Sequence, residues 1–203
     1  NIKPQRGWQA AAGLYLNSPS GIWEYSVEGY YKRMSDYLDY RGGAKLLMNH
    51  HIETDVINTQ GHAYGVELQV KKQVGKLNGW MSYTYSRTFL RQNDKRIEKP
   101  VNNGDWYPTE YDKPHDFKFV GNYKFTHRYS MSINVDYSTG RPTTIPAGQY
   151  YDESTQSMRV YYTERNSYRI PDYFRTDISF NIEPSHHLTL LTHSSISIGV
   201  YNV

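Results

Sequence analysis

Apolar and polar side chains alternate along most of this chain, and that alternation limits the possible fold more than any other feature. The clearest run places apolar side chains at Tyr129, Met131, Ile133, Val135 and Tyr137, with serine, asparagine and aspartate between them. A period of two is typical of a β-strand with two chemically different faces. The pattern recurs in segments that begin near residues 23, 64, 81, 117 and 174, and less cleanly in those that begin near residues 8 and 188. We therefore expect about eight strands of about ten residues each.

The connections between these segments alternate between short and long, which is an independent signal. Short turns are expected at 17–21, 75–76, 126–128 and 183–187, and long segments at 34–61, 88–114 and 140–172. This rhythm is typical of an up-and-down membrane barrel with short periplasmic turns and long extracellular loops. Soluble strands average only about five or six residues. The fold class expected is therefore all-β, an antiparallel up-and-down transmembrane β-barrel segment.

Aromatic residues collect at the two ends of the apolar stripes. One end of the stripes carries Trp8, Tyr31, Tyr64, Tyr85, Phe117, Tyr137 and Phe174, and the opposite end carries Trp23, Tyr25, Phe125 and Tyr129. Tyrosine and tryptophan combine an apolar ring with a polar tip, which suits the interface between membrane and water. We expect these residues to form two membrane-interface belts. A soluble sandwich or a lipocalin-like barrel, with its apolar face turned inward, is the alternative interpretation.

The composition excludes several other classes of protein. The chain has no cysteine, so it can form neither a disulfide framework nor a thiolate metal site. Its net charge of +3 is small and spread out, which gives no support for nucleic-acid binding. No apolar run approaches the roughly 20 residues that a membrane helix needs.

Two polar clusters could be interpreted as chemical sites, and we favour a simpler explanation for both. His50, His51, Glu53 and Asp55 resemble metal ligands, but a hydrated loop accounts for them. Glu24 and Glu28 share one strand face, as catalytic carboxylates do, but that face of a barrel is a polar lumen. We therefore expect no enzymatic activity, no metal and no cofactor.

Six segments carry family-like motifs: Ala63–Leu68, Gly79–Ser86, Asp112–Phe117, Tyr137–Pro142, Arg169–Asp177 and Gly199–Val203. In this order they resemble the barrel of TonB-dependent outer-membrane receptors, especially those of Bacteroidetes-type bacteria. Many members of the family carry leucine where Thr176 stands, and such barrels usually end on an aromatic residue, unlike Val203. The match covers nearly the whole chain.

The resemblance implies a receptor in the bacterial outer membrane for TonB-dependent active uptake of a scarce or bulky nutrient, such as a siderophore, glycan, peptide or vitamin. Its implied partners are outer-membrane lipid, TonB through an N-terminal region, the nutrient and a surface lipoprotein. Family barrels have 22 strands and a plugged lumen. Residues 1–203 are therefore expected to be part of one barrel domain, without the plug and the remaining strands. The alternatives are a small structural or adhesive eight-stranded barrel and a soluble ligand-binding barrel.

Ligand contacts are expected in the long segments 88–114 and 140–172. Long loops carry function on rigid scaffolds, and aromatic side chains provide contact area at low entropic cost. The candidate ligand-binding residues are Trp106, Tyr107, Tyr111, Arg141, Tyr150, Tyr151, Tyr161, Tyr162 and Arg165.

Overall fold

The computed structural model describes residues 4–40, 56–92, 99–154, 156–183 and 195–202. Within these residues nine strands form one antiparallel sheet in the order β1-β2-β3-β4-β6-β7-β12-β13, with β5 paired to β4 off that path. The strands are β1 (Arg6–Asn17), β2 (Trp23–Tyr40), β3 (Val56–Lys72), β4 (Leu77–Arg91), β5 (Tyr107–Pro108), β6 (His115–Lys124), β7 (Tyr129–Ser138), β12 (Tyr173–Ile182) and β13 (Ile196–Val200). The sheet is open, because β1 and β13 lie at its opposite edges.

Two small sheets and one helical turn lie in the long connections. The strand β8 (Pro142–Thr143) pairs with β11 (Tyr168–Arg169), and β9 (Pro146–Asp152) pairs with β10 (Ser157–Tyr162). A single 3-10 turn spans Val101–Gly104. Among the described residues, no helix is long and apolar enough to cross a membrane.

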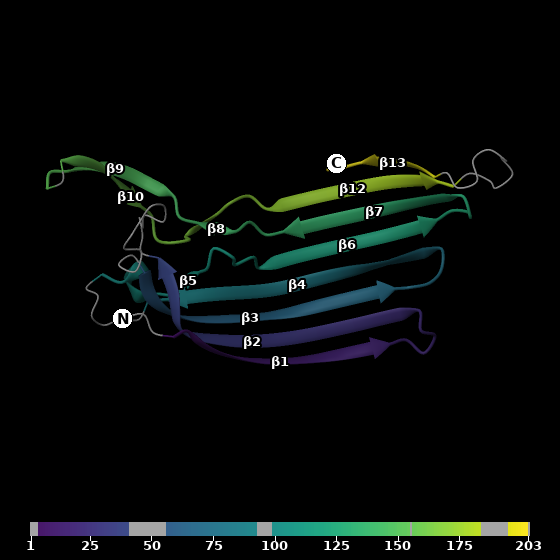
Figure 1. Ribbon diagram of the computed structural model, residues 1–203, viewed down its shortest axis with the longest axis horizontal. Coiled ribbons are helices and arrows are strands. Elements are labelled where there is room, and N and C mark those ends of the chain that lie inside the picture. Colours follow the sequence, from purple (N-terminus) through teal and green to yellow (C-terminus); the bar gives the residue numbers. More distant parts are fainter. Residues whose placement is uncertain (1–3, 41–55, 93–98, 155, 184–194, 203) are drawn as a thin grey trace.

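Short turns lie at one end of the sheet and long connections at the other, as the sequence predicts (Figure 1). We call these the turn end and the loop end. In the first turn, Ser18 Oγ accepts a hydrogen bond from the Trp23 amide at 3.0 Å, and Gly21 adopts a φ of 66°. In the third turn, Thr126 Oγ1 accepts from the amides of Arg128 and Tyr129. Serine, threonine and glycine are the residues that such tight turns require. Most of the turn expected at 183–187 lies outside the described residues.

The strand register places the apolar stripes on one face of the sheet. One line of directly opposite partners runs across seven strands through Leu14, Val27, Leu68, Tyr83, Phe117, Tyr137 and Phe174. The neighbouring line runs through Gly13, Glu28, Glu67, Thr84, Asp116, Ser138 and Tyr173. Because side chains alternate along a strand, these lines belong to opposite faces, which we call the apolar face and the polar face.

The apolar face is the more exposed one, which is the reverse of a soluble sheet protein. Leu14 is 65% exposed, Leu68 43% and Phe174 59%. The buried hydrophobic residues among those described are few, namely Ile57, Ala63, Leu90 and Tyr107. They lie near the loop end, where connections pack against the polar face of β2, β3 and β4. The fold therefore needs an apolar environment outside the sheet, which water does not provide.

The strands β2 and β3 are longer than the sequence pattern predicts, with 18 and 17 residues. The assignment of all of 34–61 to a loop was wrong at both ends, because β2 continues to Tyr40 and β3 begins at Val56. A β-bulge interrupts the register between Met34 and Tyr37, with Asp36 at a φ of 52°. Beyond the bulge the alternation no longer separates apolar from polar side chains, although the backbone pairing continues. The prediction therefore missed these extensions.

The other long segments also contain strands. The strand β4 continues to Arg91 inside the segment expected to be a loop from residue 88, and β5 lies later in that segment. The segment 140–172 holds β8, β9, β10 and β11. Short paired segments outside the main sheet carry no regular apolar stripe, so hydrophobic periodicity alone does not reveal them.

Candidate functional site

Asp112 joins three parts of the chain at the base of the long connections. Its carboxylate is buried and accepts hydrogen bonds from Arg87 Nε at 3.2 Å and from the Thr88 amide at 2.8 Å. Arg169 forms an ion pair with the same carboxylate, and its Nη1 donates to the carbonyl oxygens of Asp112 and Gly140. Two guanidinium groups thus compensate one buried charge, as a buried carboxylate requires. The contacts hold the segment 140–172 against β4.

Gly140 lies at the same base, at a point where no larger residue fits. A Cβ atom built on Gly140 would lie 1.7 Å from the carbonyl oxygen of Ile170. The Gly140 amide donates to Asp172 Oδ1 at 2.9 Å, and Tyr137 Oη donates to Asp172 Oδ2 at 2.7 Å. These two hydrogen bonds lower the pKa of Asp172 below its ordinary value, the one from Tyr137 contributing most. The two ends of the segment 140–172 are therefore fixed to each other.

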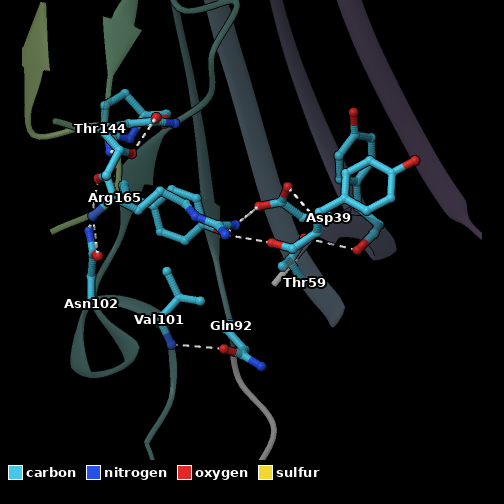
Figure 2. A network of polar contacts seen from close by, with 12 residues as sticks. Asp39, Thr59, Gln92, Val101, Asn102, Thr144 and Arg165 are labelled. Atoms are coloured by element: carbon cyan, nitrogen blue, oxygen red, sulfur yellow. Dashed lines mark hydrogen bonds and ion pairs between the residues drawn. The ribbon is translucent and has the colours of Figure 1, made fainter. Parts of the chain in front are cut away.

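A second polar network ties the far part of this segment to β2 (Figure 2). Arg165 Nη1 lies 2.6 Å from Asp39 Oδ2, and its Nη2 donates to the Tyr40 carbonyl oxygen at 2.5 Å. Tyr107 Oη donates to the same Asp39 oxygen at 2.8 Å. Residues 126 positions apart in the sequence are thus in direct contact. The network draws the connection after β10 across the polar face toward the end of β2.

Asparagine side chains hold the backbone of the same connection. Asn102 Oδ1 accepts from the Arg165 amide at 2.7 Å, and Asn102 Nδ2 donates to the Arg165 carbonyl oxygen at 3.1 Å. Asn166 Nδ2 donates to the Pro108 carbonyl oxygen at 2.8 Å, and the Asn166 amide donates to Thr144 Oγ1 at 3.0 Å. An amide that donates and accepts at once fixes both position and direction. The connection therefore has a defined path.

These contacts enclose a cavity of about 750 Å³ at the loop end. The cavity is lined by Tyr37, Leu38, Asp39, Tyr40, Leu90, Val101, Asn102, Tyr107, Thr109, Glu110, Tyr111, Thr144, Tyr162, Thr163, Arg165 and Asn166. Its volume lies in the range of small-molecule sites, roughly 300–1,000 Å³. Five tyrosine rings provide stacking surfaces, while amides, hydroxyls and two carboxylates provide hydrogen-bonding groups. Because Asp39 already neutralises Arg165, the lining suits a polar ligand with ring surfaces better than a highly charged anion.

Tyr107 is the deepest of these aromatic residues, with 1% exposure. Burial, followed by the Asp39 carboxylate, raises the pKa of Tyr107 well above its ordinary value. Its hydroxyl group therefore keeps its proton and remains a donor to Asp39 at any physiological pH. The ring lies within 5.8 Å of the Arg165 guanidinium carbon. Tyr107 thus supports the position of Arg165 through both its ring and its hydroxyl group.

The structure divides the nine candidate ligand-binding residues into two groups. Tyr107, Tyr111, Tyr162 and Arg165 line the cavity. Tyr150, Tyr151 and Tyr161 lie outside it on the β9–β10 hairpin, where each is more than half exposed. Arg141 also lies outside the lining.

Trp106 lies on the opposite side of the sheet from the cavity. Its ring meets the His62 ring edge-on at 4.4 Å, and the register puts His62 on the apolar face with Tyr64.

Sequence reasoning missed the contribution of β2 to the cavity. Tyr37, Asp39 and Tyr40 follow the apolar stripe of that strand in a tyrosine-rich stretch, and this enrichment was the available signal. The polar cluster at residues 50–55 lies outside the described residues. Within the described residues, no group of three or more histidine and acidic side chains could hold a metal ion.

Glu24 is engaged with its neighbours on the polar face. It contacts Lys71 Nζ at 3.4 Å and accepts a hydrogen bond from Gln73.

Comparison with known proteins identifies the fold. The family described as "TonB dependent receptor-like, beta-barrel" matches residues 1–203, so the chain belongs to this family. No curated protein matches the sequence. The chain lies in the bacterial outer membrane, with the turn end periplasmic and the loop end extracellular.

Three solved structures resemble the chain. They are the FrpB iron transporter from Neisseria meningitidis (TM-score 0.58, 14% identity), the ferripyoverdine receptor of Pseudomonas aeruginosa bound to ferripyoverdine (0.60, 12%), and the ferric-catecholate import receptor Fiu from E. coli in a closed form (0.60, 14%). The comparisons cover 99%, 100% and 100% of this chain, respectively. The chain spans 27%, 24% and 24% of the length of those proteins.

Proposed function

We propose that this chain forms part of the wall and of the ligand-binding loops of a receptor for TonB-dependent uptake of a scarce or bulky nutrient. The observation that carries the proposal is the cavity of about 750 Å³ among the extracellular connections. The cavity lies on the polar face, which is the lumen side of a barrel wall. A ligand bound there would already be at the entrance of the transport path.

The ligand that fits this lining is a polar molecule with ring surfaces, such as a siderophore, glycan, peptide or vitamin. The three similar proteins are named for iron, ferripyoverdine and ferric-catecholate transport, so ferric siderophores are the first candidates to test, and those of low net charge, such as ferric hydroxamates, suit the lining best. Contacts from Tyr111, Tyr162 and Glu110 would come from two different connections. The ligand would therefore bridge the segments 99–114 and 140–172.

A binding experiment on the full-length receptor tests the site. The probes are ferric catecholates, ferric hydroxamates, vitamin B12, malto-oligosaccharides and short peptides, each titrated calorimetrically. For whichever probe binds, Tyr162→Ala should weaken binding about fivefold or more, because an aromatic contact of this kind contributes more than about 1 kcal/mol. Tyr151→Ala is the matched control, since Tyr151 belongs to the same hairpin and lies outside the cavity. Equal effects of the two variants would place the ligand elsewhere.

The coupling to TonB needs a separate measurement. Uptake of the bound probe by cells should stop when TonB is removed, while surface binding continues. Uptake that persists without TonB would contradict the proposed mechanism. The alternative of a small closed eight-stranded barrel receives no support from the described residues, because β1 and β13 do not pair with each other.

A pair of carboxylates supports a plug on the lumen side. Glu28 and Glu67 are directly opposite each other on the polar face. Like charges in that position destabilise a sheet. Among the described residues, Glu28 accepts a hydrogen bond from Tyr15 Oη at 3.1 Å, and neither carboxylate forms an ion pair. We propose that a cationic side chain of the plug compensates this pair in the whole receptor.

The sign of a stability change tests that compensation. In the full-length receptor, Glu67→Gln should lower the melting temperature if a plug cation binds the pair. It should raise the melting temperature if the two carboxylates only repel each other. A rise would remove this support for the plug.

The exposed aromatic residues at the two ends of the apolar face are proposed to mark the edges of the bilayer. The rings of Trp8 and Tyr31 lie 5.6 Å apart toward the loop end, and those of Trp23 and Tyr25 lie 6.2 Å apart toward the turn end. Trp23 and Tyr31 are eight residues apart on β2, which is roughly 27 Å along the strand. That length is close to the ~25 Å height of the apolar band in such barrels. The strand continues well beyond Tyr31, so its last part would stand above the membrane.

A further inference from the structure

A group of cationic side chains lies on the apolar face, partly level with the aromatic residues at the loop end and partly just beyond them. Arg33 is directly opposite both Trp8 and His62, and Arg87 is directly opposite Tyr64. Two further arginines continue the same face. Arg6 lies two residues beyond Trp8, and Arg91 lies two residues beyond Phe89. We call Arg6, Arg33, Arg87 and Arg91 the cationic patch; its members lie on β1, β2 and β4, and the His62 ring of β3 lies between them.

Aromatic rings, rather than carboxylates, hold most of this patch in place. The Arg91 guanidinium carbon lies 4.7 Å from the centre of the Trp106 ring, and that of Arg87 lies 4.5 Å from the centre of the Phe89 ring. His62 packs edge-on against the same Trp106 ring. A guanidinium stacked on a ring is fixed in position while many of its N–H donors stay available. The patch is thus an ordered group of donors.

The positive charge of the patch is largely uncompensated. Arg6 and Arg33 are exposed, and neither forms an ion pair with another described residue. Arg91 Nε is buried and has no hydrogen-bond partner in the described part of the chain. Asp112 binds Arg87, but it is shared with Arg169. Asp105, next to Trp106 in sequence, forms no ion pair among the described residues.

The position of the patch shows that it faces the lipid interface. It lies on the face that turns to lipid. Arg33 and Arg87 are level with Trp8 and Tyr64, and Arg6 and Arg91 lie beyond them on the extracellular side. Arginine in the hydrocarbon region of a barrel is costly, but the cost falls close to zero at the interface. The interface also offers phosphate groups, which match the planar guanidinium in geometry and charge. Trp106 thus belongs to the membrane side of the wall, and its loop holds cations there.

We propose that the cationic patch binds the phosphate groups of the phosphorylated glycolipid in the outer leaflet. Arg33 on β2 and both Arg87 and Arg91 on β4 would contact one head group, with Arg6 at its edge. The proposal does not depend on which nutrient the receptor binds. It requires only that the apolar face meets lipid.

The test uses the full-length receptor in nanodiscs that contain diphosphorylated or fully dephosphorylated lipid A. Native mass spectrometry counts the lipid A molecules retained and gives their affinity. The parent protein should retain the diphosphorylated lipid and not the dephosphorylated one. Basic residues near a membrane surface each contribute about 1 kcal/mol, or about fivefold in affinity. The triple variant Arg6→Gln/Arg33→Gln/Arg91→Gln should therefore bind on the order of a hundredfold more weakly.

Lys72→Gln is the matched control. Lys72 also lies on the apolar face, with its ammonium group 5.8 Å from the centre of the Trp23 ring, but it belongs to the turn end. The control should bind the glycolipid as the parent does. If the triple variant does not fold, Arg33→Gln and Arg33→Lys replace it, with lysine expected to retain more binding than glutamine.

Three results would overturn the proposal. The first is retention of dephosphorylated lipid A by the parent protein as strongly as the phosphorylated form. The second is unchanged binding in the arginine variants, and the third is an equal loss in Lys72→Gln.

Discussion

Replacing Arg165 by alanine should release the extracellular connection after β10 from the end of β2. The change removes the ion pair with Asp39 at 2.6 Å and the hydrogen bond to the Tyr40 carbonyl oxygen at 2.5 Å. The side chains of Arg165 and Asp39 are only 16% and 24% exposed. Breaking a buried ion pair costs about 3–5 kcal/mol, whereas an exposed pair contributes at most about 1 kcal/mol. The Tyr107 hydroxyl group still donates to Asp39, which offsets part of the loss.

We therefore expect a cost of about 2–3 kcal/mol, which is roughly a 30- to 150-fold increase in the population of the opened connection. Hydrogen–deuterium exchange of the full-length receptor, followed by mass spectrometry of peptides from 163–169, measures that population directly. The variant Asp39→Asn, alone and combined with Arg165→Ala, completes a double-mutant cycle. Non-additive effects would assign the loss to this pair.

Arg159→Ala is the control for the loss of an arginine from the same segment. Arg159 pairs with Asp152 at 2.7 Å, but its side chain is 51% exposed, so its removal should cost less than about 1 kcal/mol. If both variants exchange at the same rate near residues 163–169, or if Arg165→Ala exchanges as the parent does, the reasoning about this network is wrong.

Three further predictions concern the wall and the base of the loops. Val135→Arg on the apolar face should lower barrel stability in lipid by about 2–4 kcal/mol, and Asn134→Arg on the polar face of the same strand should cost clearly less; equal costs in denaturant titrations would contradict the assignment of faces. Gly140→Ala should destabilise the receptor by about 2 kcal/mol or more because its Cβ would meet a carbonyl oxygen, whereas Gly148→Ala meets nothing within 4 Å and should be neutral or slightly stabilising. The pKa of Asp172 is lower in the folded protein than in the unfolded chain, so its hydrogen bonds stabilise the segment 140–172 fully above the unfolded pKa of about 4. That stabilisation is lost as the pH falls through the lower folded pKa, so proteolysis of the segment should accelerate at acidic pH in the parent protein. If the parent is as insensitive to pH as Asp172→Asn, this reasoning is wrong.

The wall could be predicted from the sequence wherever lipid and lumen impose opposite chemistry on the two faces. The strand β7 spans Tyr129–Ser138, which are the limits that its alternation predicts. The line from Leu14 to Phe174 also follows from predicted stripes, because a shift of one residue in register would turn each stripe to the wrong face. Local periodicity is sufficient there because every residue contacts one of two environments.

The cavity could be predicted only in part, because its contacts join distant segments. Tyr107, Tyr162 and Arg165 were recognisable as aromatic or cationic loop residues. Nothing local in the sequence pairs Arg165 with Asp39, which lies 126 positions earlier. Trp106 was expected in the ligand site because of its residue type. It lies on the other face of the sheet because neighbouring residues in a strand point to opposite faces and Tyr107 points into the cavity. Composition indicates which side chains are available, and only the register decides the side of the wall on which each one lies.

The β9–β10 hairpin behaves as a self-contained unit within a long connection, outside the wall. Its two strands pair with each other and with no other strand described, while Arg169, Gly140 and Asp112 fix the ends of the segment that carries it. Changes at the hairpin tip, between Asp152 and Ser157, therefore leave both the sheet and the cavity lining intact. Such a position can accept substitutions and insertions without loss of the barrel wall. It is also the natural place to insert an epitope for display on the cell surface.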